Sequence, residues 1–491
     1  MMTEQTTPTT ADTGAGAAAG RPVPPPGDPG GPPDFARLRA EEYGYLDETR
    51  HVYLDHTGAG LPARRQLLAQ TERLTRAVHG NPHTHSPASA PTTALVEEAR
   101  ARVLEFAGAD PAEYTAVFTA NATAACRLVG EGYPFRPGRA ELLLTLDNHN
   151  SVNGLREFAR ARRTPTTYIP LSGPGLRVDG ETLASALAGR RGERGLFAFP
   201  AQSNFSGVRH PLEWIPYARE RGWHTLLDAA AFAPANRLSL REHPADFTVL
   251  SWYKVFGYPT GVGCLIARDS ALALLRRPWF SGGTIRAASA QGQWHHPADG
   301  AAAFEDGTVN FHAIPEVTTG IDWIESIGVD AVHDHVTALT GRLLTGLTRL
   351  RHSDGTPLIR LYGPRTVHRR GGTVALNVLD ARGSVLDERI VARDSTAARI
   401  SLRTGCFCNP GAGEAAFAID HGVLVRTGRD RTLTSMDDYL TSLGLPSGGA
   451  VRVSVGLSSS PGDIDRLLGF LESSYRDRVP GPDTLLPRTF C

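Results

Sequence analysis

Short apolar runs alternate with amphipathic stretches from Val52 onward, and this alternation limits the possible folds more than any other feature of the sequence. The apolar runs occupy residues 116–118, 142–144, 196–199, 225–227 and 247–250. Helical patterns such as residues 95–106 and 155–162 lie between them. A strand-then-helix alternation of this length predicts an α/β fold with a mainly parallel sheet covered by helices.

The pattern also divides the chain into parts. Residues 1–33 are rich in Thr, Ala, Gly and Pro and lack aromatic residues, so we expect a disordered tail. We expect residues 34–50 to pack with the small domain and residues 51–315 to form a large cofactor-binding domain. A long helical stretch begins near Glu316, and we expect residues 316–491 to form this linking helix and a smaller C-terminal domain.

The composition excludes several classes of protein. A formal net charge of zero gives no electrostatic reason to expect binding to nucleic acid or to an anionic membrane. We find no apolar run long enough to span a bilayer and no secretory signal pattern at the N-terminus. Five cysteines in so long a chain are sparse and odd in number, which favours a reducing compartment and therefore the cytoplasm.

Lys254 is the only lysine among the 51 basic residues. A preference for arginine explains why other lysines are missing, but it does not explain why one remains. A guanidinium cannot replace an ε-amine where the amine must lose a proton and form a carbon–nitrogen bond. Lys254 is therefore a candidate for covalent amine chemistry.

Polar residues follow several predicted strands, and ligands of α/β sheets gather at the carboxyl ends of the strands. Lys254 and Asp228 each follow such a run. Pyridoxal 5'-phosphate (PLP) needs an amine for a Schiff base and a carboxylate that keeps its ring nitrogen protonated. These two residues supply both groups. An Asp after a strand is also a common turn or N-cap residue, so the pair alone does not decide the matter.

The other predicted strand ends supply the remaining contacts of PLP. His149 offers a planar ring for stacking, and Ala122 and Thr123 offer a strand-to-helix turn for the phosphate. The amide of Asn204 is expected to contact the ring 3'-oxygen. Each has an ordinary alternative, because a lone His is often structural and residues 119–123 could merely cap a helix.

The motifs around these residues resemble class V aminotransferase-fold enzymes, specifically cysteine desulfurases. The resemblance covers roughly residues 45–475 and is carried, in order, by residues 53–60, 81–86, 228–230, 251–254, 258–263, 304–310 and 451–454. It implies the PLP-dependent transferase fold type I, with a mainly parallel seven-stranded sheet between helices and a smaller α+β domain. It also implies that Ser251, Tyr253 and Thr308 hold the phosphate, with Thr308 acting on the neighbouring subunit of a homodimer.

The segment 402–413 is similar to the Arg-Thr-Gly-Cys-Phe-Cys-Asn-Pro-Gly-Ala-Cys signature of molybdenum cofactor sulfurases, except that Gly413 replaces the last cysteine. On this pattern Cys408 is the nucleophile and Cys406 lies two residues earlier. A Gly- and Pro-bounded loop suits a thiol that must be exposed and mobile. There are two alternatives. Cys406 and Cys408 could be ordinary buried cysteines, or they could bind a metal, although a second pair of cysteines at metal-site spacing is missing.

The resemblance implies a reaction in which L-cysteine becomes L-alanine and leaves a persulfide on Cys408. Arg452 and Asn204 bind the substrate, Lys254 moves the Cα proton and His149 assists; no metal is implied. The final acceptor stays open among molybdopterin, a carrier protein and a biosynthetic intermediate. Longer sulfurases continue into a molybdopterin-binding domain, whereas this sequence ends at Cys491, so we expect a separate partner.

Two other functions remain open. The same fold serves PLP enzymes without persulfide chemistry, including aminotransferases, epimerases and carbon–sulfur lyases acting on amino acids. A non-catalytic scaffold that keeps the fold is the second alternative, although Lys254 and Asp228 argue against it.

Overall fold

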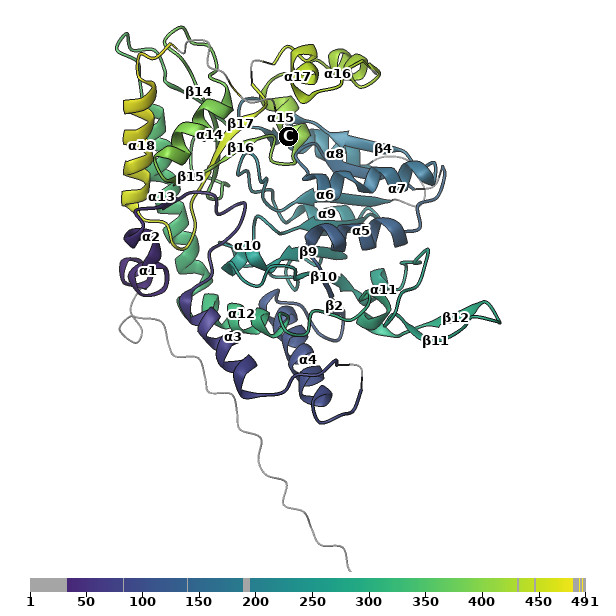
Figure 1. Cartoon of the computed structure of the whole chain (residues 1–491). Helices are drawn as coiled ribbons and strands as arrows, with labels where there is room; N and C mark the ends of the chain where they lie inside the picture. Colours follow the sequence, from purple (N-terminus) through teal and green to yellow (C-terminus); the bar gives the residue numbers. More distant parts are fainter. Residues whose placement is uncertain are drawn as a thin grey trace, which may run out of the picture.

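The computed structural model describes residues 33–82, 84–138, 140–188, 195–430, 432–445, 447–479, 485 and 488 (Figure 1). All of the predicted disordered tail except Pro33 lies outside these residues. Among the residues described, no helix combines the length and the apolar character needed to cross a membrane.

A seven-stranded sheet is built from strands that lie between Tyr114 and Arg268. Its order is β2-β10-β9-β8-β7-β3-β4. The five strands from β9 to β4 run parallel, and β10 is antiparallel to both of its neighbours. The strands are β2 (Tyr114–Thr119), β10 (Gly263–Arg268), β9 (Phe247–Ser251), β8 (His224–Asp228), β7 (Leu196–Pro200), β3 (Leu142–Thr145) and β4 (Thr166–Ile169). This sheet confirms the predicted α/β fold.

Helices cover both faces of the sheet, which explains why its strands read as continuous apolar runs. Successive strand residues face opposite sides. Ala198 and Leu226 pack with one layer of helices, whereas Phe197 and Leu227 pack with the other. The first layer contains α5 (Ala122–Gly132), α6 (Asn150–Asn153), α7 (Leu155–Ala161) and α11 (Asp269–Leu272). The second contains α4 (Ser89–Phe106), α8 (Gly180–Ala188), α9 (Trp214–Arg219) and α12 (Pro315–Ile327).

A four-stranded antiparallel sheet, ordered β13-β14-β17-β16, organises the C-terminal part of the chain. Its strands are β13 (Ile359–Tyr362), β14 (Thr373–Val378), β17 (Ala450–Ser454) and β16 (Arg403–Gly405). Gly328, with a φ of 93°, separates α12 from α13 (Val329–Arg349) in the predicted linking stretch. The accompanying helices are α14 (Glu388–Ala397), α15 (Pro410–Ala416), α16 (His421–Thr427), α17 (Met436–Ser442) and α18 (Pro461–Tyr475).

The N-terminal segment lies against this C-terminal part. Arg39 of α1 (Phe35–Tyr43) is buried and forms an ion pair of 2.6 Å with Asp463 of α18. It also donates to the carbonyl oxygen of Ser458 at 2.5 Å. Strand β1 (Val52–Tyr53) then pairs in parallel with β15 (Ile400–Ser401). The N-terminal elements α1 and β1 therefore pack directly against α18 and β15 of the C-terminal part.

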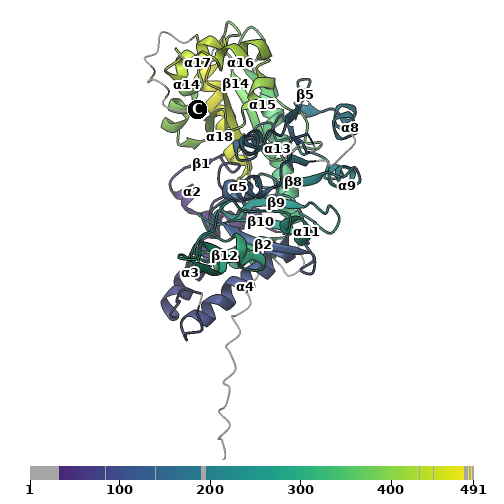
Figure 2. The same ribbon diagram turned by 90° about the vertical axis from the view of Figure 1, so that its right-hand side faces the viewer.

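The remaining elements lie around these two sheets. Figures 1 and 2 place α3 and α4 at one end of the molecule and α16 and α17 at the other. The hairpin of β11 and β12 projects away from the seven-stranded sheet (Figure 1). The bounds of the other elements are α2 (Tyr45–Glu48), α3 (Arg64–Arg76), β5 (Leu171–Ser172), β6 (Arg177–Val178), α10 (Trp252–Phe256), β11 (Ile285–Ser289), β12 (Trp294–Pro297) and the 3-10 helix η1 (Gly300–Phe304).

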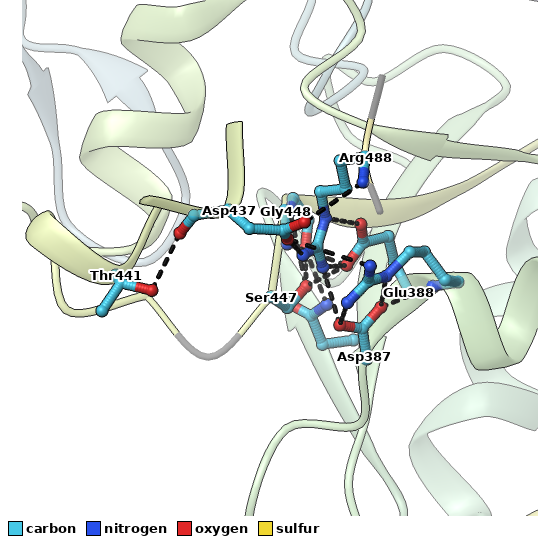
Figure 3. Close-up of polar contacts among 10 residues, drawn as sticks. Asp387, Glu388, Asp437, Thr441, Ser447, Gly448 and Arg488 are labelled. Atoms are coloured by element: carbon cyan, nitrogen blue, oxygen red, sulfur yellow. Dashed lines mark hydrogen bonds and ion pairs between the residues drawn. The ribbon is translucent and has the colours of Figure 1, made fainter. Parts of the chain in front are cut away.

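Arg488 contacts a group of carboxylates on the C-terminal part (Figure 3). Its guanidinium lies 2.7 Å from Asp387 and 3.0 Å from Glu388, and it also pairs with Asp437. Glu388 accepts hydrogen bonds at 2.8 Å from the hydroxyl of Ser447 and from the backbone N–H of Gly448. These contacts fix the turn that enters β17, the neighbour of β16.

Candidate active site

A cavity of about 380 Å³ lies at the carboxyl ends of the parallel strands and contains most of the predicted site residues. The predicted residues that line it are Ala122, Thr123, His149, Asn204, Asp228, Ser251, Tyr253 and Lys254. They come from five separate strand ends, as the position of ligands in α/β sheets requires. Cys406, Cys408, Thr308 and Arg452, which were also predicted, are not among its lining residues.

Lys254 lies in the short helix α10, directly after β9. The helix ends at Gly257, whose φ of 80° is left-handed. A Cβ at Gly257 would lie 2.1 Å from the carbonyl carbon of Leu61, so only glycine fits there. Burial lowers the pKa of the Lys254 amine, and the nearby Asp228 carboxylate opposes that shift. An amine held in this way can lose its proton more easily than a surface lysine.

Asp228 closes β8 and is 8% exposed. Its Oδ1 accepts a hydrogen bond of 3.0 Å from the backbone N–H of Ala230. Asp228 therefore also caps a turn, which is the ordinary role of an Asp that follows a strand. The same carboxylate lines the cavity and partly opposes the lowering of the pKa of both Lys254 and His149 by burial. Asp228 can thus serve as an anionic partner for a protonated ring nitrogen.

The N-terminus of α5 forms the part of the cavity that suits a phosphate group. The backbone N–H of Ala122 donates to Ser251 Oγ at 3.0 Å. Thr123 Oγ1 lies 2.6 Å from Ser151 Oγ. Hydroxyls gathered at the start of an 11-residue helix can bind a phosphate, because its first N–H groups point toward the ligand. The sequence argument missed Ser151, whose only signal was its place two residues after His149.

His149 precedes α6, and its ring is neutral in this environment. Burial is the main cause that lowers its pKa to about 4, with a further contribution from Lys254. The backbone N–H of Ser151 donates to Nδ1 at 3.1 Å, so the single proton of the neutral ring lies on Nε2. A neutral planar ring at the cavity wall suits stacking on an aromatic cofactor.

Two amides in the segment 202–204 line the cavity, but the structure uses them differently. Asn204 Nδ2 donates to the carbonyl oxygen of Phe407 at 2.8 Å, and Asn204 Oδ1 accepts from Asn409 at 2.8 Å. Gln202 Oε1 is buried and has no partner among the described residues, whereas the amide of Asn204 is hydrogen-bonded to the loop that follows β16.

Taken together, the cavity fits a planar cofactor that bears a phosphate and an aldehyde. It offers an amine with a lowered pKa, a carboxylate, a neutral imidazole and a helix N-terminus with hydroxyls. The buried oxygen of Gln202 is a further group that lacks a partner until a ligand supplies one. Lys254, Asp228 and the α5 turn are the residues that could hold such a group.

Arg452 of β17 is buried and already paired. Its Nη2 donates to Asp55 Oδ1 at 2.8 Å, and its Nη1 donates to the carbonyl oxygen of Asn204 at 3.2 Å. Arg403 donates to the other oxygen of Asp55 at 2.7 Å. Sequence reasoning did not identify Asp55 as this partner. Arg452 Nε is buried without a partner, so this guanidinium still has a donor for a substrate carboxylate.

Cys408 lies in a turn beside the cavity. It is a free cysteine with an exposed side chain, whereas Cys406 is disulfide-bonded. The backbone N–H of Asn150 donates to the Cys408 carbonyl oxygen at 2.7 Å, which places the turn next to the loop of His149. Of these two cysteines, Cys408 therefore has the thiol that is ready to react.

Thr308 lies in a neighbouring cavity of about 270 Å³, which shares Gly261 and Ala120 with the first one. Asn81 Nδ2 donates to Thr308 Oγ1 at 3.4 Å. Thr308 is thus separate from Lys254 within one chain, and its expected contact with the phosphate of a second subunit remains a prediction.

His56 predicts how the stability of the fold depends on pH. Burial is the main cause that lowers its pKa from 6.5 to about 4, against an opposing effect of Asp55. The unfolded chain therefore binds the proton first as the pH falls, and stability is lost between pH 6.5 and 4. We expect the loss of unfolding free energy between pH 6.5 and 4.5 to be smaller by roughly 2 kcal/mol in His56→Asn. Urea titrations at both pH values measure this, and equal losses in the two proteins would contradict it.

The sequence pattern of the aminotransferase class-V family matches residues 52–467. The molybdenum cofactor sulfurase of Arabidopsis thaliana is 35% identical over 487 residues, covering 91% of this chain and 59% of that protein. The molybdenum cofactor sulfurase of Homo sapiens is 34% identical over 461 residues, covering 90% of this chain and 51% of that protein. The chain thus spans between about half and three fifths of these relatives.

Solved structures show the same fold. The apo cysteine desulfurase of Thermococcus onnurineus NA1 has a TM-score of 0.73 and 25% sequence identity, covering 89% of this chain and 97% of that one. The cystine C-S lyase C-DES has a TM-score of 0.66 at 18% identity, covering 88% of this chain and 99% of that one. These matches confirm the expected fold over most of the chain.

Proposed function

The chain belongs to the aminotransferase class-V family, and we propose that it is a PLP-dependent cysteine desulfurase that carries sulfur as a persulfide on Cys408. The observation that carries this proposal is the position of the thiol. Cys408 is free and exposed. A backbone hydrogen bond joins its turn to the loop of His149 at the edge of the Lys254 cavity. The sequence similarity to molybdenum cofactor sulfurases supports the same chemistry.

Lys254, Asp228 and Arg452 act in the first half of the reaction. Bound PLP supplies an electron sink for negative charge that develops at the substrate Cα. Lys254, with its lowered pKa, takes the Cα proton. The carboxylate of Asp228 would stabilise the protonated form of the ring nitrogen. Arg452 binds the substrate carboxylate through the donor that Asp55 leaves free.

Cys408 performs the sulfur transfer. Its thiolate attacks the sulfur of L-cysteine, a sulfur–sulfur bond forms and the bond between that sulfur and Cβ breaks. The electron pair of the broken bond stays on the carbon side, which takes up a proton and leaves as L-alanine. The enzyme retains the sulfur as a persulfide, so no external oxidant or reductant is needed in this half-reaction.

The later fate of the sulfur and the assembly of the protein extend this proposal. The relatives named molybdenum cofactor sulfurase favour the molybdenum cofactor as the acceptor of the persulfide sulfur. A homodimer would bring Thr308 of one subunit to the phosphate site of the other. The sparse cysteines favour action in the cytoplasm, whereas the disulfide bond of Cys406 counts against a reducing compartment.

A PLP lyase that forms no persulfide on the enzyme is the second candidate, since a cystine C-S lyase, whose reaction product is cysteine persulfide, has the same fold. With L-cysteine as its substrate, a C-S lyase would release pyruvate, ammonia and sulfide and would not need Cys408. A single turnover with L-cysteine in the absence of reductant distinguishes the two. We expect one alanine for each persulfide, quantified by amino-acid analysis and mass spectrometry of Cys408. Pyruvate with free sulfide would overturn the proposal.

A further inference from the structure

Asn409, the residue after Cys408, joins three loops through its side chain. It is fully buried and precedes α15. Its Nδ2 donates to the carbonyl oxygen of Asp147 at 2.7 Å and to Asn204 Oδ1 at 2.8 Å. Its Oδ1 accepts from the backbone N–H of Ala412 at 3.2 Å. One amide therefore caps α15 and also binds the loops that follow β3 and β7.

The same contacts continue to the two residues before Asn409. Asn204, whose Oδ1 is bound by Asn409, donates to the carbonyl oxygen of Phe407 at 2.8 Å. The carbonyl oxygen of Cys408 accepts from the backbone N–H of Asn150 at 2.7 Å. Each carbonyl of the Phe407–Cys408 pair is thus attached to a loop that contributes a wall residue of the Lys254 cavity.

The turn needs this support because its backbone is strained. Phe407 and Cys408 have φ values of 55° and 53°, in the left-handed region that residues with a side chain rarely adopt. Two such residues in succession persist only where their surroundings hold them. Without the hydrogen bonds to Asn204 and Asn150, the turn would relax toward ordinary backbone angles and move the thiol.

The anchor to which Asn409 binds is itself rigid. The carboxylate of Asp147 lies 2.9 Å from His210 Nε2, and both side chains are buried. The helix α15 also packs closely on this loop, since a Cβ at Gly411 would lie 2.1 Å from the carbonyl oxygen of Leu146. The position of the Cys408 turn is therefore set by the buried loop that follows β3 and not by the exposed residues around the turn.

We propose that Asn409 is a positioning residue that holds the Cys408 thiol at the edge of the Lys254 cavity through Asp147 and Asn204. Its catalytic consequence rests on the proposed desulfurase reaction. The consequence follows from geometry, since the attacking sulfur must lie close to and in line with the bond that breaks, and small misplacements lower the rate strongly. Asn409 itself contacts neither substrate nor cofactor.

Two substitutions separate positioning from helix capping. Asn409→Ser keeps an oxygen that can cap α15, but it is too short to reach Asp147 and Asn204. Asn409→Ala removes the cap as well. If neither folds, Asn409→Asp keeps the shape and the cap while removing both donated hydrogen bonds. Asp420→Ala, which removes the cap of the nearby helix α16, is the matched control.

The measurements use the PLP-loaded protein. In Asn409→Ser we expect hydrogen exchange at the Asn150 N–H to rise about tenfold, the absorbance of bound PLP to stay unchanged and kcat for alanine formation to fall ten- to a hundredfold at constant KM. Asp420→Ala should change none of these. Unchanged exchange and kcat in Asn409→Ser, or a defect only in Asn409→Ala, would overturn the proposal. If the wild type forms no persulfide, the desulfurase proposal fails and exchange at Asn150 alone decides the positioning role.

Discussion

Replacement of Cys408 with serine is expected to abolish the persulfide and to lower cysteine-dependent alanine formation by roughly a thousandfold. Among the residues that the structure describes, no other cysteine can replace this thiol, since Cys406 is disulfide-bonded. Cys126 and Cys264 are buried, and burial raises the pKa of both thiols, so neither offers a thiolate to the substrate. The absorbance of bound PLP and its loss on addition of L-cysteine should stay as in the wild type, because Cys408 does not line the cavity.

Cys406→Ser is the matched control for this experiment. It removes a cysteine only two residues away, in the same loop, that is disulfide-bonded in the structure. We expect this variant to retain the persulfide on Cys408 and to keep alanine formation within a few-fold of the wild type. Mass spectrometry after one turnover locates the extra sulfur. A persulfide on Cys406, or alanine formation that survives Cys408→Ser, would contradict the assignment.

The fold could be predicted from the sequence because strands of a parallel sheet are apolar on both faces. Residues 196–200 and 247–251 are buried throughout, and the apolar side chains that this burial requires made the two strands recognisable in the sequence. The direction of β10 was not predicted, since its composition resembles that of a parallel strand. Only 11 residues (252–262) connect β9 to β10. This is too short for the usual crossover of a parallel pair, which explains why β10 turns back.

The site residues could be predicted where they directly follow a predicted strand, because ligands of α/β sheets bind at the strand ends. Lys254, Asp228 and His149 were found in this way, and the structure places all three at one cavity. The hydrogen bonds between distant loops could not be predicted. Asp55 and Arg452 are 397 positions apart, and Asn204 and Asn409 are 205 apart. Pairs at such separations leave no periodic signal in one sequence, so the role of Asn204 and the partner of Arg452 needed the structure.

Lys254→Ala is expected to have the largest effect on activity. We expect alanine formation to fall by about four orders of magnitude or more, because the variant loses both the covalent attachment of PLP and the base for the Cα proton. PLP should still bind through Asp228 and the hydroxyls around α5, with the absorbance of the free aldehyde in place of that of the lysine-bound form. Ultraviolet–visible spectra with and without L-cysteine measure both effects.

Lys254→Arg is the decisive comparison in a chain that uses arginine at every other basic position. It keeps the positive charge near Asp228, but a guanidinium does not lose its proton in a protein and does not form the bond to PLP. We therefore expect Lys254→Arg to be as inactive as Lys254→Ala. A small primary amine added to Lys254→Ala should restore part of the proton transfer, whereas it should not help Cys408→Ser. Substantial activity in Lys254→Arg would show that Lys254 contributes only charge, and the proposed chemistry would then be wrong.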